Sequence, residues 1–167
     1  MSKNKQKDQA ATTAPSALHD AIEQTPDVKG HYCKGLQALE DDSSKIIVPQ
    51  PRLIGGSLNI DKAVKGLYPD EARWDYALEY DGATYFVEVH PAFTGEVDKM
   101  KKKLAWLQNW LKTKAPEIDK LKSSRHPYAW VYTGTFAIMK TSKQYKQLAQ
   151  MGLLPTSSWD FEKMNKT

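Results

Sequence analysis

One predicted β-hairpin, over residues 74–90, constrains this chain more than any other feature of its sequence. Asp81 and Gly82 form the dipeptide that a two-residue type I′ turn favours, because both central residues of that turn take a positive φ. The turn sets the register by pairing Tyr80 with Ala83. Period-2 alternation then predicts one apolar and aromatic face, made of Trp74, Tyr76, Leu78, Tyr80, Ala83, Tyr85, Val87 and Val89.

The same register brings two acidic side chains together near the open end of the hairpin. It sets Asp75 directly opposite Glu88, at a Cβ separation of about 4.5–5.5 Å. Two carboxylates that close repel, so they need a cation, a shared proton or solvation at an exposed strand end. Mg²⁺ or Mn²⁺ is one solution, because these ions prefer carboxylate and water oxygens. The alternative is a solvent-facing hairpin whose acidic residues only keep the sheet soluble.

An imidazole follows the second acid. His90 lies two residues after Glu88 and therefore points to the same face of the strand. There it can ligate a metal ion, act as a general base or hydrogen-bond a phosphate. Asp75 and Glu88 are therefore candidate metal ligands, and His90 is a candidate catalytic residue. Glu40, earlier in the chain, is a candidate for a further carboxylate.

Length and composition predict one domain. The chain has 167 residues, of which 40% are hydrophobic, enough for a single core. We expect a flexible tail over residues 1–28, in which residues 16–24 favour a short helix, a single α/β domain over 29–156 and a C-terminal tail over 157–167. No apolar run approaches the length of a membrane span, and no secretory signal is evident. With Cys33 as its single cysteine, the chain is predicted to be cytoplasmic.

The positive charge of the chain is concentrated. The net charge is +4 and the pI is about 9.0, which allows contact with nucleic acid. A solvated helix face is the alternative explanation for such lysines. The basic residues gather in three stretches: Lys99, Lys101, Lys102 and Lys103; Lys112, Lys114, Lys120, Lys122 and Arg125; and Lys140, Lys143 and Lys146. We predict DNA or RNA as a partner.

The order of predicted elements indicates the fold class. An amphipathic helix from about residue 97 to 111 separates the hairpin from a strand over 126–132. A right-handed crossover would place that strand parallel to residues 84–90. The predicted class is α/β (α+β), with a mixed central sheet built on the hairpin and a crossover helix. Further expected elements are a helix over 31–39, a short strand over 45–48, a turn at 55–57, a strand over 135–139 and a helix over 142–151.

This order resembles the core of the PD-(D/E)XK nuclease superfamily, the restriction-endonuclease-like fold. Its members place an Asp on one hairpin strand and a Glu-x-Lys on the next. Asp75 and the run Glu88-Val89-His90 occupy those places here, separated as Asp-x12-Glu-x-His. Asp70 is a second candidate for the leading acid, but the hairpin register favours Asp75.

The chain departs from the family pattern at the lysine, whose place His90 takes. Lys99 or Lys102, at the start of the long helix, are candidates to replace it. The resemblance implies a nuclease that cleaves phosphodiester bonds, with Mg²⁺ or Mn²⁺ held by Asp75 and Glu88 and with His90 acting on the attacking water. Two alternatives stay open: a nuclease-like fold without activity that binds nucleic acid or protein, and a partner-binding protein whose interface uses Trp74, Trp106, Trp110 and Trp130.

Overall fold

A four-stranded sheet organises the protein, for which a computed structural model describes residues 16–166. No helix in that range is both long and apolar enough to cross a bilayer. In chain order the elements are α2 (Ala17–Glu23), η1 (Pro26–Val28), η2 (Gln37–Lys45), β1 (Ile46–Ile47), η3 (Pro51–Leu53), β2 (Ile54–Asn59), α3 (Ile60–Val64), β3 (Tyr76–Tyr80), β4 (Ala83–Val89), η4 (Thr94–Glu96), α4 (Val97–Thr113), α5 (Pro116–Asp119), β5 (Tyr128–Val131), α6 (Lys143–Gln150), β6 (Trp159–Asp160) and α7 (Phe161–Asn165).

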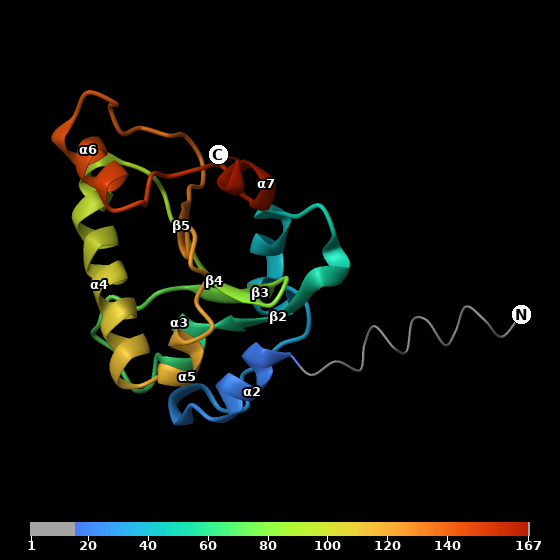
Figure 1. The fold of residues 1–167 in the computed structure, drawn as a ribbon. Helices are drawn as coiled ribbons and strands as arrows, with labels where there is room; N and C mark the ends of the chain where they lie inside the picture. Colours follow the sequence, from blue (N-terminus) through green and yellow to red (C-terminus); the bar gives the residue numbers. More distant parts are fainter. Residues whose placement is uncertain (1–15, 167) are drawn as a thin grey trace, which may run out of the picture.

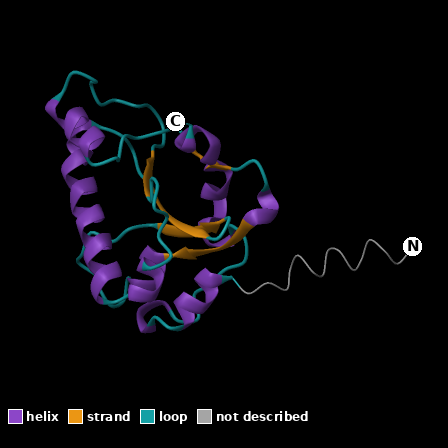
Figure 2. Cartoon of the chain, in the orientation of Figure 1, coloured by secondary structure: helices purple, strands orange, loops and turns teal. Residues whose placement is uncertain are grey.

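The sheet is mixed, as the element order predicts. Its strand order is β2-β3-β4-β5, in which β2, β3 and β4 run antiparallel and β5 runs parallel to β4. The parallel pair is joined through α4, the crossover helix (Figure 1, Figure 2). The chain is therefore a mixed α/β protein, and the expected fold class is confirmed at that level.

The hairpin at the centre of this sheet has the predicted register. Tyr80 pairs with Ala83, and Tyr76 pairs with Val87. Asp81 takes a φ of 48° and the following glycine a φ of 81°, the positive values that a type I′ turn requires. The turn chemistry alone was sufficient to set five cross-strand pairs correctly.

The two faces of the sheet are covered by different elements. On one face a core of buried side chains joins α2 and α4 to Ala77 and Phe86 of the hairpin. Trp74 belongs to this core, so its predicted place on the other face is wrong. The reason is local: β3 begins at Tyr76, and strict alternation does not extend to residues before the strand.

The opposite face is covered by the end of the chain. Trp159 is fully buried against Tyr80 and Tyr85, and β6 pairs in parallel with β1. Figure 1 shows α7 on the other side of the sheet from α4. The prediction of a C-terminal tail over 157–167 is therefore wrong for its described part, because the aromatic face of the hairpin needs a cover that a tail would not supply.

The N-terminal boundary also lies earlier than predicted. Leu18 and Val28 are fully buried in the core, so residues 16–28 belong to the folded domain. The expected short helix is present as α2, capped by the Ser16 side chain. The rest of the predicted tail, residues 1–15, lies outside the described residues. Burial of these apolar side chains against the sheet holds the segment in place.

Several shorter elements differ from expectation. Residues 31–36 form no helix, and the 3₁₀ segment η2 is broken at Glu40, which takes a φ of 49°. Residues 135–139 form no strand, but Ala137 makes one bridge to Phe93. The expected turn at 55–57 is instead part of β2. Whether a short apolar or glycine-containing run forms a helix, a strand or a turn depends on its tertiary pairing.

Gly55 in β2 makes room for the buried carboxylate of Glu79. Glu79 on β3 accepts hydrogen bonds from the Ser16 hydroxyl and from the Leu18 backbone N–H, both at 2.8 Å. A Cβ at Gly55 would lie 1.7 Å from Glu79 Oε1. The glycine therefore allows Glu79 to hold the first turn of α2 against the sheet.

We expect Gly55→Ala to destabilise the fold by about 2–3 kcal/mol, because the Glu79 carboxylate must move and loses charge-assisted hydrogen bonds worth about 1.5–3 kcal/mol each. Urea denaturation measures the loss. Gly66→Ala is the matched control, since a Cβ there meets nothing within 4 Å, and it should change the stability by less than about 1 kcal/mol. Equal effects of the two substitutions would refute this role of Gly55.

Candidate functional site

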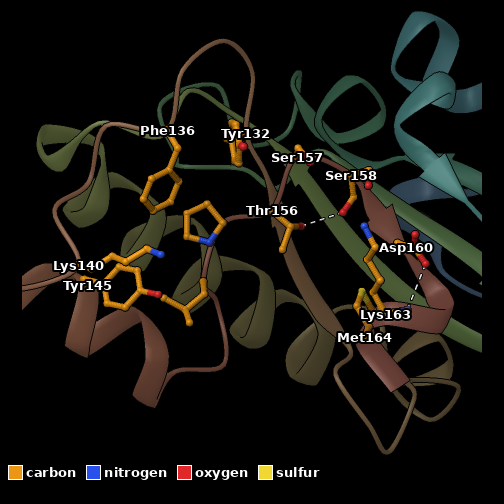
Figure 3. Close-up of a pocket in the computed structure, with 12 residues that line it drawn as sticks. Tyr132, Phe136, Lys140, Tyr145, Thr156, Ser157, Ser158, Asp160, Lys163 and Met164 are labelled. Carbon is orange, nitrogen blue, oxygen red and sulfur yellow. Dashed lines mark hydrogen bonds between the residues drawn. The ribbon is translucent and has the colours of Figure 1, made fainter. Parts of the chain in front are cut away.

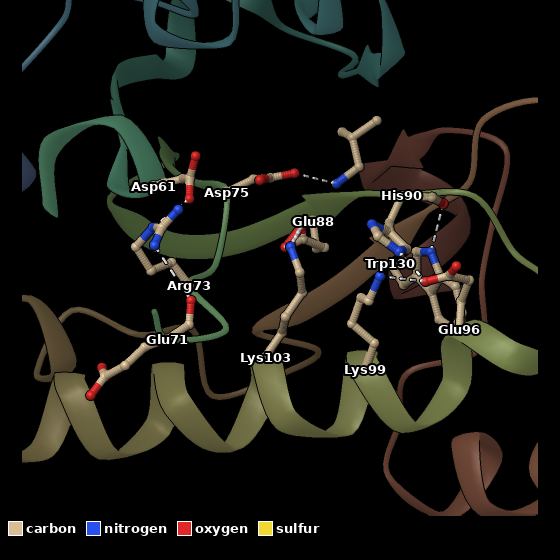
Figure 4. A network of polar contacts seen from close by, with 11 residues as sticks. Asp61, Glu71, Arg73, Asp75, Glu88, His90, Glu96, Lys99, Lys103 and Trp130 are labelled. Carbon is tan, nitrogen blue, oxygen red and sulfur yellow. Dashed lines mark hydrogen bonds and ion pairs between the residues drawn. The ribbon is translucent and has the colours of Figure 1, made fainter. Parts of the chain in front are cut away.

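A buried ion pair occupies the middle of the predicted site. Glu88, near the end of β4, has an exposed fraction of 0%. Its Oε1 and Oε2 accept hydrogen bonds from Lys103 Nζ at 2.7 and 3.2 Å. Figure 4 shows the Lys103 side chain reaching from α4 to this carboxylate. A cation from the crossover helix thus lies against the acid of the hairpin.

The helix places this lysine by its periodicity. Lys103 stands three residues after Met100 and four before Leu107, and both of these side chains are fully buried. Residues at such spacing share one helix face, so Lys103 lies in the stripe that faces the sheet. The suggested lysines do not reach Glu88: Lys99 pairs with Glu96 at 3.4 Å, and Lys102 is exposed. The buried stripe was the signal that could have identified Lys103.

Asp75 connects the start of β3 to β4. Its Oδ2 accepts a hydrogen bond from the Val89 N–H at 3.1 Å, and its backbone carbonyl accepts one from the Ile60 N–H at 2.8 Å. In Figure 4 its carboxylate points toward the backbone of the residue after Glu88. Asp70, the second candidate for the leading acid, is exposed in a turn.

The charge of Asp75 acts on Glu88. The pKa of Glu88 is raised well above its usual value, first by burial and then by the charge of Asp75 and a hydrogen bond with it. The nearby Lys103 opposes this rise. A carboxyl with such a pKa holds a proton more readily than an ordinary glutamate, so a metal ion that binds it competes with the proton.

His90 lies at the end of β4 but has a partner of its own. Its Nε2 is 2.7 Å from Glu96 Oε2, and its backbone carbonyl accepts a hydrogen bond from Trp130 Nε1 at 2.8 Å. The hydrogen bond with His90 is also the main reason that the pKa of Glu96 is lowered. Glu96 was not anticipated, and the acidic N-terminus of the long helix was the only hint of it.

Glu40 is not part of this arrangement. It is exposed, and its charge acts on Tyr76, whose hydroxyl donates to Asp42 Oδ2 at 2.7 Å. Burial and these acids raise the pKa of Tyr76. Glu40 is not among the groups that shift the pKa of Glu88, so the structure gives no support to its use as a further carboxylate of the site.

Asp75 and Glu88 are the residues of this region that could hold a divalent cation. Asp75 and Glu88 offer hard carboxylate oxygens, and their mutual repulsion is the condition that a divalent cation would relieve. Within residues 16–166, no group of three or more His, Cys, Asp and Glu side chains is gathered as a metal site. Mg²⁺ commonly takes one or two carboxylates and fills its other positions with water and phosphate. Two acids are therefore a sufficient set.

Comparison with known proteins adds no family to this geometry. No family model matches the chain, and no significant match exists among curated proteins or solved structures.

Proposed function

We propose that this protein is a metal-dependent nuclease of the PD-(D/E)XK type. Asp75 and Glu88 would hold Mg²⁺ or Mn²⁺, and Lys103 would provide the cation that the family places two residues after its glutamate. The observation that carries the proposal is the interaction of the two carboxyls beside the Lys103 amine, 2.7 Å from Glu88. The order of three antiparallel strands, crossover helix and parallel strand supports the resemblance to the restriction-endonuclease-like fold.

Each residue would have a distinct task. A bound metal ion would lower the pKa of a water molecule and neutralise charge on the scissile phosphate. Lys103 carries a permanent positive charge that would stabilise the negative charge developing there. Glu96 holds His90 through Nε2, and His90 Nδ1 has no partner among residues 16–166, so it would be free to accept a proton from the attacking water.

A second candidate is a nuclease-like fold that binds nucleic acid without cutting it. The observation in its favour is the complete burial of Glu88 in an ion pair with Lys103. In this case Lys103 permanently occupies the place of a metal ion, and the pair has a structural role. Binding would then depend on salt concentration, as contact with phosphates requires, and no turnover would accompany it.

Cleavage assays separate the two candidates. End-labelled single-stranded DNA, duplex DNA and RNA are incubated with Mg²⁺, Mn²⁺ or EDTA, and cleavage is expected only with a metal ion. Asp75→Asn should lower the rate about a hundredfold, or roughly 3 kcal/mol of barrier, because the amide keeps the hydrogen bond from Val89 but loses the charge. Asp70→Asn is the matched control and should cleave normally.

Two results would count against the nuclease. Cleavage that persists in EDTA would exclude a metal mechanism at these acids. Salt-dependent binding of all three substrates with no cleavage under any metal condition would favour the second candidate.

A further inference from the structure

An aromatic pocket lies beyond the parallel edge of the sheet, outside the candidate site. Its volume is about 610 Å³, within the range of about 300–1,000 Å³ common for ligand pockets. Tyr132, Phe136 and Tyr145 form one part of its lining (Figure 3). Their rings are neighbours, with centroid distances of 5.6 and 6.5 Å along this series, and all three are only partly buried. Exposed faces of such rings are platforms on which flat groups can stack.

A second pocket adjoins the first, and we call the two together the groove. The second pocket, of about 230 Å³, shares Leu154, Thr156 and Met164 with the first. His126 and Tyr128 also line this second pocket. Two adjoining pockets offer places for two consecutive units of a chain.

The charge around the groove favours an anionic occupant. The linings of the two pockets contain two lysines and one acidic residue. Lys140 and Lys163 line the first pocket, and neither side-chain amine has an ion-pair partner among residues 16–166. Asp160 is the acid in the lining, and its Oδ1 accepts the Lys163 backbone N–H at 3.2 Å, which caps α7.

The groove is also connected to the candidate site. The Ala137 N–H, next to the aromatic Phe136, donates a hydrogen bond to the Ala92 carbonyl at 2.9 Å. Ala92 follows His90 by two residues. The segment that lines the groove is therefore fixed to the segment that leaves the strand of the candidate site.

We propose that this groove binds single-stranded nucleic acid, with bases stacked on the three aromatic rings and phosphates near Lys140 and Lys163. Aromatic platforms beside a basic surface are the usual means of holding single strands without sequence preference. The inference rests on the proposed function in one respect: the groove would hold the strand on which the nuclease acts. It names single strands as the substrate class and requires no metal ion for binding.

Fluorescence anisotropy in EDTA tests the proposal without cleavage. A labelled 20-nucleotide oligo(dT) should bind more tightly than a duplex of equal length. Phe136→Leu and Tyr145→Leu, which keep aliphatic packing but remove the ring faces, should each weaken single-strand binding about tenfold. Lys140→Gln with Lys163→Gln should make the salt slope shallower by about 0.7 per phosphate that is no longer neutralised. Lys65→Gln, exposed at the end of α3 and outside the three basic stretches, is the matched control and should bind as the unchanged protein does.

The outcomes also separate this inference from the nuclease. Glu88→Gln should keep full single-strand binding, because Glu88 does not line the groove. Single-strand binding by the unchanged protein without any cleavage would overturn the nuclease and leave the groove supported. If the unchanged protein cleaves normally but Phe136→Leu and Tyr145→Leu have its melting temperature and its single-strand affinity, the groove proposal alone is overturned. Equal affinity for single strands and duplexes, or competition by polyglutamate as strong as by oligo(dT), would likewise overturn it.

Discussion

Replacing Glu88 with glutamine is expected to lower metal-dependent cleavage at least about a thousandfold, or roughly 4 kcal/mol of barrier. Glutamine has nearly the same shape but no charge, so it cannot balance a divalent cation in a site that excludes water. Glu88 is fully buried and Asp75 is only partly so, and the missing charge at Glu88 has no solvent to replace it. Rates measured on one end-labelled substrate with Mn²⁺ give the effect.

Glu88→Gln should nevertheless fold. The amide oxygen of glutamine can still accept a hydrogen bond from Lys103 Nζ, as Glu88 Oε1 does, and burial opposes a charged side chain there. We expect the free energy of unfolding at neutral pH to change by less than about 2 kcal/mol, since one charge-assisted hydrogen bond with Lys103 is weakened. Cleavage at the unchanged rate in a folded Glu88→Gln protein would remove this site from consideration.

Replacing Lys103 with methionine is expected to destabilise the protein by about 3–5 kcal/mol at alkaline pH, because it leaves Glu88 buried without its cation. The Lys103 side chain is 16% exposed and that of Glu88 is 0% exposed, so water cannot replace the ammonium. Denaturation by guanidinium at several pH values measures the loss. Lys102→Met, one position away on the exposed face of α4, is the matched control and should change the stability by less than about 0.5 kcal/mol.

The pH dependence of this effect has a definite sign. A carboxyl whose pKa is raised by folding contributes stability that is fully present below its unfolded pKa of 4.5. That contribution is lost as the pH rises through the folded pKa. Lys103 lowers the pKa of Glu88, so Lys103→Met raises it further and the loss grows with pH. The variant and the unchanged protein should differ least near pH 4.5 and most at alkaline pH. A difference independent of pH would show that the lysine acts through packing alone.

Local chemistry made the hairpin predictable. Asp81 and Gly82 select one turn, and that turn sets every pair from Tyr80 and Ala83 outward. The periodic apolar residues of α4 predicted the crossover helix, and the handedness rule then predicted a strand parallel to β4. The observed pairs end at Tyr76 and Val87, and the Asp75 carboxylate, just before β3, accepts the Val89 N–H.

Contacts between distant elements were decided by tertiary structure. The sequence suggested Lys99 or Lys102 beside Glu88, but the direction in which α4 packs on the sheet brings Lys103 there instead. His90 is held by Glu96, the residue directly before the start of α4.

The boundaries of the domain depended on tertiary packing, whereas the hairpin depended on local sequence. The sequence by itself determined the hairpin and its register, because these depend on neighbours along two strands. Only the tertiary structure showed that α2 and Trp159 complete the two faces of the sheet. Their polar surroundings in sequence resemble a tail, and their burial depends on an aromatic face that exists only when the hairpin has formed. The same packing places Lys103 beside Glu88 and forms the two pockets of the groove at the edge of the sheet.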